Sequence, residues 1–315
     1  MSLFFWIGIF IVSLAVLIKA AGYFTDSASA LGHILGLPQF IIGVTIVSIG
    51  TSLPELASSI SAVSKGVTDM VAGNVVGSNI ANIFLVIGLA TVLSKKGRLE
   101  VTRNLINLDL PLLAGGGIIM MILLLWDGKV TFWEGIISLI GYSIYLHYTL
   151  VYREKKREKE KEGKKGKIDR KIILGLVLGA VFIYYGANYT IESVMKISEI
   201  LNIGTAVIAL TAVAIGTSLP EIFVSISAAR KGNDAVALGN VFGSNIFNGF
   251  VVLGIPALIK TLDVTSVVLS VAVPFFVAAT VLYIISGITR KIYKWEGAMY
   301  LLIYVLFIAK LFNLF

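Results

Sequence analysis

The stretch GTSLPE at residues 50–55 occurs a second time, letter for letter, at residues 216–221 of this 315-residue chain. A second phrase follows each copy: residues 73–80 read GNVVGSNI and residues 239–246 read GNVFGSNI. Both phrases recur at one offset of 166 residues. Each copy places a glutamate inside a long apolar stretch, and a carboxylate within a membrane is costly enough to indicate a functional site.

The composition is that of a helical membrane protein. Hydrophobic residues make up 57% of the chain and charged residues 14%, whereas soluble domains carry about 25% charged residues. Apolar runs of about 20 residues, each long enough to cross roughly 30 Å of hydrocarbon as a helix, recur along the whole chain. We therefore predict an all-α polytopic membrane protein with ten transmembrane helices, at residues 3–23, 38–64, 69–94, 105–126, 130–151, 171–190, 204–229, 235–259, 264–287 and 296–314.

The distribution of lysine and arginine predicts the orientation. The charged break at 152–171 is rich in both, and if it is cytoplasmic, nine further cations also lie inside: Lys95, Lys96, Arg98, Arg103, Arg230, Lys231, Arg290, Lys291 and Lys294. The outer loops and the C-terminus then hold Lys65, Lys129, Lys196, Lys260 and Lys310. This imbalance follows the positive-inside rule. We expect a multi-pass protein of the plasma membrane with both termini outside, and the net charge of +8, which lies mostly in loops, indicates no nucleic-acid partner.

The duplication predicts an inverted repeat. In an ungapped alignment of 42–89 with 208–255, about 27 of the 48 positions are identical, and a period of this length indicates a duplicated half rather than a solenoid. Five helices per half is an odd number, so the second half enters the membrane from the opposite side. We expect a single integral unit made of a repeat at 1–151, a short cytoplasmic linker at 152–171 and a repeat at 172–315. Transporters of this design bind their substrate near the midplane, on broken helices.

The breaks are expected at the two prolines. Pro54 and Pro220 lack an N–H group, and their rings crowd the carbonyl four residues back, which frees backbone carbonyls around Gly50–Thr51 and Gly216–Thr217. In a membrane such groups need another partner. Thr51 and Ser52 lie four and three residues before Glu55, so on a helix their side chains share its face.

The polar side chains near these breaks form an all-oxygen set. Two carboxylates, hydroxyls, amide oxygens and loosened carbonyls are donors that suit Ca²⁺ and Na⁺. The chain has no cysteine, which excludes disulfides and thiolate sites. Two carboxylates neutralise one Ca²⁺, and several Na⁺ ions could use the same oxygens only after it has left, which is a direct route to exchange. The glycine pairs 73/77 and 239/243 favour close helix packing.

The doubled phrases resemble the α-repeats of the cation/Ca²⁺ exchanger superfamily, and within it the Na⁺/Ca²⁺ exchangers. The resemblance implies that Glu55 and Glu221 bind Ca²⁺ and Na⁺, that Thr51 and Thr217 lend carbonyls, and that hydroxyls come from Ser52, Ser218, Ser78 and Ser244. Asn82 and Asn248 are either further ligands or hydrogen-bonding spacers. The family pattern also implies an electrogenic cycle of about three Na⁺ per Ca²⁺, by alternating access in which the first and sixth helices slide past the core.

Two departures refine the resemblance. K⁺-dependent exchangers carry an aspartate where this chain has Asn248, so K⁺ cotransport is not expected. The linker is too short for the cytosolic Ca²⁺-sensing domains of animal exchangers. We expect a functional monomer with Na⁺, Ca²⁺ and the bilayer as its partners, no cofactor and no catalytic residues.

Several alternatives remain open from the sequence. Exchange of H⁺ for Ca²⁺, or of another divalent ion such as Mg²⁺, would use the same oxygen donors. A cation channel would also place oxygen ligands at the midplane, although repeated halves within one chain are typical of alternating access. An intramembrane hydrolase is the weakest alternative, because the chain contains no nucleophile elbow and no His-Glu-x-x-His helix.

Overall fold

The computed structural model of the chain describes residues 2–35, 48–101, 110–154 and 169–314. Most of the predicted linker at 152–171 and the first part of the predicted span at 38–64 lie outside the described residues. In the first half the helices are α1 (Leu3–Ile34), α3 (Ser48–Thr51), α4 (Leu53–Ser64), α5 (Asp69–Ile80), η2 (Ala81–Ile87), α6 (Gly88–Val92), α7 (Leu110–Leu125) and α8 (Phe132–Glu154).

The helices of the second half are α9 (Arg170–Leu201), α10 (Thr205–Ile208), η4 (Ala209–Val213), α11 (Ala214–Thr217), α12 (Leu219–Arg230), α13 (Asp234–Phe247), η5 (Asn248–Val252), α14 (Leu253–Ile259), η6 (Val268–Ala272), α15 (Val273–Ile288) and α16 (Lys294–Leu311). The η segments are π-helical turns inserted between α-helical stretches. Such turns are rare and often lie at functional sites.

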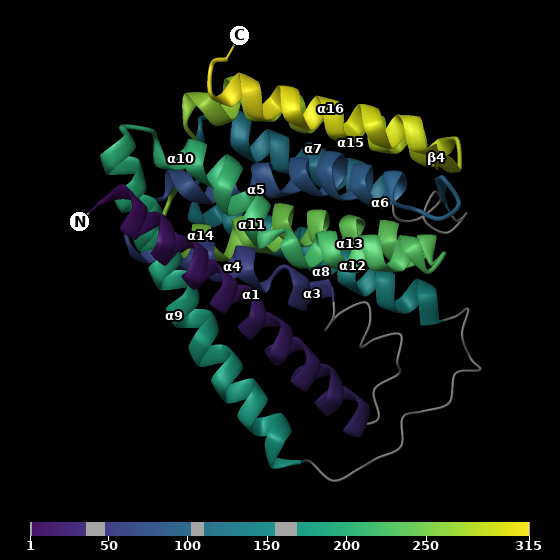
Figure 1. Cartoon of the computed structure of the whole chain (residues 1–315), viewed down its shortest axis with the longest axis horizontal. Coiled ribbons are helices and arrows are strands. Elements are labelled where there is room, and N and C mark those ends of the chain that lie inside the picture. Colours follow the sequence, from purple (N-terminus) through teal and green to yellow (C-terminus); the bar gives the residue numbers. More distant parts are fainter. Residues whose placement is uncertain (1, 36–47, 102–109, 155–168, 315) are drawn as a thin grey trace.

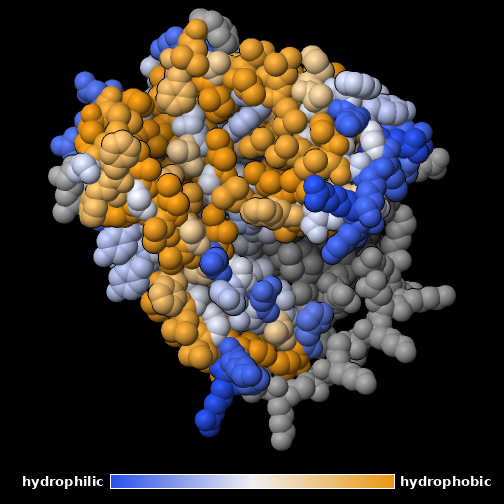
Figure 2. Space-filling view, viewed as in Figure 1, coloured by the Kyte–Doolittle hydropathy of each residue, from blue (hydrophilic) through white to orange (hydrophobic). Residues whose placement is uncertain are grey.

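Most of the molecule's helices suit a bilayer. Among the described residues, five helices are long and apolar enough to cross a membrane, and one bent pair adds a sixth. Figure 2 shows apolar side chains over most of one face, with hydrophilic ones gathered toward the end that carries β4. The prediction of a helical membrane protein is confirmed. The count of ten spans stays a prediction, because five or six described helices meet this length and hydropathy and two of the ten spans, 38–64 and 105–126, include residues outside the described ranges.

Helices α1 and α9 form an antiparallel pair that runs obliquely to the other helices (Figure 1). A Cβ atom at Gly186 would lie 2.9 Å from the Cα of Leu17, so the two backbones touch there. Both helices continue well past their predicted ends at 23 and 190, to Ile34 and Leu201. The sequence prediction stopped where the apolar run stopped, but polar residues beyond it find partners on their own helix: Thr25, for example, donates to the carbonyl of Ala21 at 2.8 Å.

Helices α5 and α13 form the centre of the bundle. The spans that contain them are 83% and 78% buried inside the protein, far more than the other candidate spans. A Cβ at Gly77 would lie 2.8 Å from the carbonyl oxygen of Leu210, which confirms the predicted close packing at the first glycine pair. The same prediction is wrong for Gly239, where a Cβ would meet open space.

Two small antiparallel ribbons join loops of the first half to loops of the second. Strand β1 (Arg98–Glu100) pairs with β4 (Lys291–Tyr293), and β2 (Lys129–Val130) pairs with β3 (Leu262–Asp263). The helical span Val268–Ile288 connects β3 to β4. Its 21 residues extend about 31 Å. The two ribbons therefore lie at opposite ends of the bundle.

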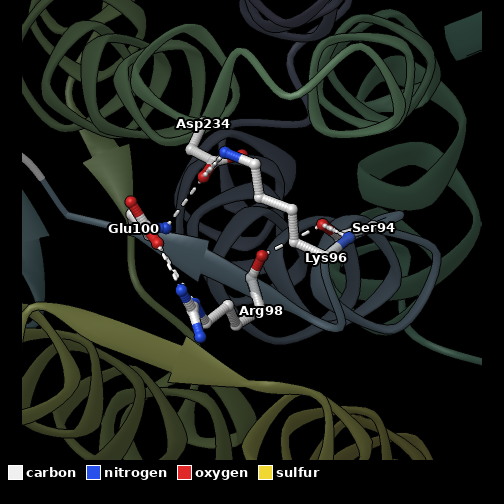
Figure 3. Close-up of polar contacts among 5 residues, drawn as sticks. All are labelled: Ser94, Lys96, Arg98, Glu100 and Asp234. Carbon is white, nitrogen blue, oxygen red and sulfur yellow. Dashed lines mark hydrogen bonds and ion pairs between the residues drawn. The ribbon is translucent and has the colours of Figure 1, made fainter.

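A buried carboxylate fastens the β1–β4 ribbon to the core (Figure 3). Asp234, in the first turn of α13, accepts the backbone N–H of Glu100 at 3.1 Å and pairs with Lys96 at 3.5 Å. Arg98 donates to the Glu100 carboxylate at 2.8 Å, and this hydrogen bond holds the pKa of Glu100 below its ordinary value. At the other ribbon Thr68, which aligns with Asp234, donates to Asp263 of β3 at 2.8 Å. Each half thus holds a strand of the other half.

Asp234→Ala should lower thermal stability, because it removes the acceptor of a buried N–H group and one partner of an ion pair. The expected loss is about 1–3 kcal/mol, measured as a lower melting temperature of the detergent-solubilised protein. Glu199→Gln is the matched control, since Glu199 pairs with Lys196 at the surface, where such pairs contribute about 0–1 kcal/mol. Equal melting temperatures for the two variants would contradict a fastening role for Asp234.

Candidate cation-binding site

Each repeat contains one helix break, and both breaks lie at a serine. Ser52 separates α3 from α4, and Ser218 separates α11 from α12. Their backbone angles, φ −95° and ψ 9° for Ser52 and φ −80° and ψ 4° for Ser218, fall in the bridge region between helix and strand. The second span bends by 43° at this point. The helices are therefore interrupted near the prolines, as predicted. Each break lies at the serine, one residue after the Gly-Thr pair whose carbonyls the sequence predicted to be freed.

Both breaks lie against helix α1. A Cβ at Gly50 would collide with the side chain of Thr25, and one at Gly216 would collide with that of Leu14. At Gly50 a Cβ would overlap even the Cβ of Thr25, so this approach needs glycine, whereas at Gly216 the end of the Leu14 side chain would have to move. One helix therefore covers the two breaks at points 11 residues apart along its length.

The two glutamates lie in the first turns of the helices that follow the breaks. Glu55 in α4 and Glu221 in α12 are fully buried. The N-terminal turn of a helix carries partial positive charge, which favours a carboxylate at this position. The two carboxylates are near enough to repel one another when both are charged.

The serines at the breaks bind the carboxylate of the opposite repeat. Ser52 donates to Glu221 Oε1 at 3.1 Å, and Ser218 donates to Glu55 Oε1 at 3.4 Å. Helical spacing predicts instead that Ser52 faces Glu55. The difference arises because Ser52 lies between two helices, where the periodicity that relates positions i and i+3 is interrupted.

The remaining predicted residues line the same region from α5, α13 and their π-helical extensions. Ser244 donates to Glu221 Oε1 at 3.0 Å, whereas its counterpart Ser78 has no hydrogen-bond partner among the described residues. Asn82 lies in η2, and Asn248 opens η5. All four side chains are fully buried.

The two threonines also lie at the site. Thr217 is fully buried, donates to the carbonyl of Val213 at 3.0 Å and approaches the Glu55 carboxylate. Thr51 approaches Glu221 in the same way. The structure thus brings the two glutamates together with five of the other predicted residues, Thr51, Thr217, Ser52, Ser218 and Ser244. The threonine side chains cross to the opposite repeat as Ser52 and Ser218 do. Ser78, Asn82 and Asn248 are buried on the neighbouring helices, and no contact of theirs with either carboxylate is seen among the described residues.

Several buried oxygens at the site have no hydrogen-bond partner within the part of the chain that the structure describes. They are Glu55 Oε2, Glu221 Oε2, Ser78 Oγ, Asn82 Oδ1 and Asn248 Oδ1. Buried polar atoms are nearly always paired, because an unpaired one is costly. A hard cation would satisfy these oxygens, since Ca²⁺ and Na⁺ prefer oxygen ligands of this kind. No group of three or more His, Cys, Asp or Glu side chains that could hold a metal occurs among the described residues, so hydroxyls and amides must complete any such site.

Sequence reasoning missed a second pair of residues that hold the glutamates in place. Asn74 donates to the backbone carbonyl of Glu55 at 3.2 Å, and Asn240 donates to that of Glu221 at 3.3 Å. Asn74 also donates to Ser58 and Ser59, as Asn240 does to Ser225. The sequence could have revealed these two asparagines, because both belong to the doubled second phrase and keep its offset of 166 residues.

A further asparagine pair joins α5 to α13 beside the site. Asn79 donates to the carbonyl of Asn245 at 3.4 Å, and Asn245 donates to the carbonyl of Asn79 at 3.5 Å. Asn82 adds a bond to Asn245 Oδ1 at 3.0 Å. These reciprocal bonds hold the two central helices in register around the carboxylates.

A lipid-compatible helical bundle with two buried carboxylates at opposed helix breaks has the architecture of an ion transporter. The comparisons with known proteins agree. The chain matches the sodium/calcium exchanger protein family over residues 5–151 and 171–313, and it belongs to that family.

The relatives cover nearly the whole chain. Sodium/calcium exchanger MaX1 of Methanosarcina acetivorans is 35% identical, over 96% of this chain and 97% of its own. An uncharacterized membrane protein of Methanocaldococcus jannaschii is 32% identical, over 97% of each chain. Among solved structures, the sodium-calcium exchanger NCX_Mj soaked with Na⁺ and Sr²⁺ superposes with a TM-score of 0.68 at 30% identity, covering 98% of this chain and 99% of its own.

Asn74→Ala should destabilise the protein, because it leaves the buried hydroxyls of Ser58 and Ser59 without the amide that donates to them, while the Glu55 carbonyl keeps its bond from Ser58. The expected loss is about 1–3 kcal/mol for each group left unpaired, measured as a lower melting temperature in detergent. Asn188→Ala is the control, since among the described residues the side chain of Asn188 accepts one long hydrogen bond, from Ser61 at 3.5 Å. If the variant had the same melting temperature as the unmodified protein, Asn74 would not hold the Glu55 segment in place.

Proposed function

We propose that the protein exchanges Na⁺ for Ca²⁺ at a site between Glu55 and Glu221. The observation that carries this proposal is the pair of fully buried carboxylates, each bound through one oxygen to a serine of the opposite repeat and each with its second oxygen unpaired among the described residues. We assign the ligand set to the ten residues Glu55, Glu221, Thr51, Thr217, Ser52, Ser218, Ser78, Ser244, Asn82 and Asn248.

Charge balance explains why the two ions would replace one another. Two carboxylates bring about two negative charges, which one Ca²⁺ or a small number of Na⁺ ions neutralises. In a buried site of low dielectric, excess charge of either sign is costly. The two ions therefore exclude each other from the shared oxygens, and the site remains occupied by one kind at a time. Two Na⁺ ions match the two carboxylates. The family pattern supports about three Na⁺ per Ca²⁺, and the one unbalanced positive charge would make the exchange electrogenic.

The proposed cycle is alternating access in an inverted repeat. Ten spans in two halves, 1–151 and 172–315, would place the site near the midplane. The placement of β1–β4 and β2–β3 at opposite ends of the bundle supports this arrangement, because each ribbon joins both halves. Helices α1 and α9 are the proposed moving pair, since they lie obliquely to the rest and α1 touches both breaks. The basic β1–β4 end would face the cytoplasm and both termini the outside of the plasma membrane.

Ca²⁺ uptake into proteoliposomes tests the coupling ion. Vesicles loaded with Na⁺ should accumulate Ca²⁺ faster than vesicles without Na⁺, and the rate should respond to an imposed membrane voltage. Uptake driven by a pH gradient alone would move the protein to H⁺/Ca²⁺ exchange, with the glutamates as proton carriers. A current that reverses at the equilibrium potential of a single ion would instead indicate a channel.

Glu55→Gln and Glu221→Gln should each reduce Na⁺-dependent Ca²⁺ uptake to the background of empty vesicles, because one negative charge cannot balance Ca²⁺. Size-exclusion chromatography checks that each variant remains folded. Glu192→Gln is the control, since Glu192 is half-exposed and pairs with Lys65. Full uptake by either site variant would rule out the proposed ligands.

Asn248→Asp should change the ion dependence of uptake, because it adds a third carboxylate to a fully buried set of oxygens. We expect an altered requirement for Na⁺ or a new response to K⁺, measured by titrating each ion against the initial rate. Asn188→Asp controls for a new charge away from the site. An unchanged ion dependence would mean that the Asn248 side chain does not contact the ions.

A further inference from the structure

An apolar groove of about 540 Å³ runs along helix α1 and is closed on one side by α9. Apart from Ser13 its lining is aromatic, aliphatic or glycine: Phe4, Phe5, Gly8, Ile9, Val12, Val16, Tyr185, Gly186 and Tyr189. Its volume lies within the range of about 300–1,000 Å³ that is typical of small-molecule sites. None of the ten proposed ion ligands lines it, so it is separate from the cation site.

The position of the groove on the protein shows whether lipid or water surrounds it. Helices α1 and α9 are the least buried candidate spans, with only 22% and 17% of their apolar windows covered by protein. A groove on this surface therefore faces the hydrocarbon of the bilayer rather than water. Water would gain few partners here, because a hydration site needs several polar groups. The one hydroxyl that α1 contributes to the lining, that of Ser13, already accepts a hydrogen bond from Thr190 at 3.0 Å.

The dimensions match one leaflet. From Phe4 to Val16 the groove follows twelve residue steps of α1, or about 18 Å. Half of a hydrocarbon core of about 30 Å is about 15 Å deep. Tyr185 and Tyr189 are half-exposed where α9 lines the groove. Gly8 lies further along α1, and a Cβ there would meet open space.

We infer that this groove binds one acyl chain of a membrane phospholipid, which lies along α1 and fills the space between the two helices of the oblique pair. The site recognises the acyl chain and not a headgroup, because no charged side chain lines it. The bound chain lies directly beside the Ser13–Thr190 hydrogen bond and the Gly186–Leu17 contact that join α1 to α9. Its effect on the protein is therefore to support the packing of this pair.

The test uses a phosphatidylcholine with a diazirine in its acyl chain, mixed into vesicles that contain the full-length protein. After illumination, peptides that cover residues 4–16 and 185–189 should carry more label than the lipid-facing peptides of α16, which includes the exposed Leu302 and Val305. Gly8→Phe should reduce the label on residues 9–16 and 185–189 to the level of α16, because the ring fills the floor of the groove. The fold should tolerate the change, since Gly8 has no neighbour to displace.

Gly22→Phe is the matched control. Gly22 lies on the same helix, also has open space at its Cβ, and does not line the groove. This variant should keep the labelling of the unmodified protein, and Gly8→Leu should repeat the loss with a smaller side chain. Equal labelling of the groove and α16, or groove labelling that survives Gly8→Phe, would overturn the proposal. Cross-links between two protein chains through residues 4–16 would also overturn it, because a second copy would then occupy the groove.

Discussion

Two carboxylates buried in a membrane protein are the constraint on which the rest of this structure depends. Each would be prohibitively costly alone in hydrocarbon, so the fold surrounds each with stabilising features. The break before Glu55 and Glu221 gives each carboxylate the N-terminal turn of a helix, and a serine hydroxyl reaches it from the opposite repeat. The dense packing of α5 and α13, and the asparagines that hold the glutamate carbonyls, keep these few groups at fixed positions.

Much of the site could be predicted from the sequence, because the doubled phrases mark the same residues twice. The two glutamates contact five of the other eight predicted residues, and both breaks fall two residues before the prolines. The cross-pairing of Ser52 with Glu221 could not be predicted, since helical periodicity has no meaning across a break. The hydrogen bond between Asp234 and the backbone of β1 could not be predicted either, because it depends on which loops of the two halves meet. The lengths of α1 and α9 were underestimated because polar residues beyond the apolar runs bond to carbonyls of their own helix, as Thr25 does in α1 and Ser193 in α9.

The two halves are similar in sequence but not equivalent in structure. Ser244 binds Glu221, while the matching Ser78 has no partner among the described residues. Gly77 packs tightly against Leu210, while Gly239 faces open space. Glu221 consequently receives two serine hydroxyls and Glu55 one. The two carboxylates therefore differ in their hydrogen bonding, and Glu55 has more of its acceptor positions open to other ligands.

The reciprocal bonds of Ser52 to Glu221 and of Ser218 to Glu55 also bear on the origin of the chain. In an isologous two-fold interface, residue i of one subunit contacts residue j of the other, and j contacts i. Residues 52 and 221 and residues 218 and 55 obey this rule at the 166-residue offset. Two separate copies of one half, related by a two-fold axis, would form both bonds without the linker. Joining two such copies would need a connecting segment but no new contact at these bonds, and each half could then diverge on its own.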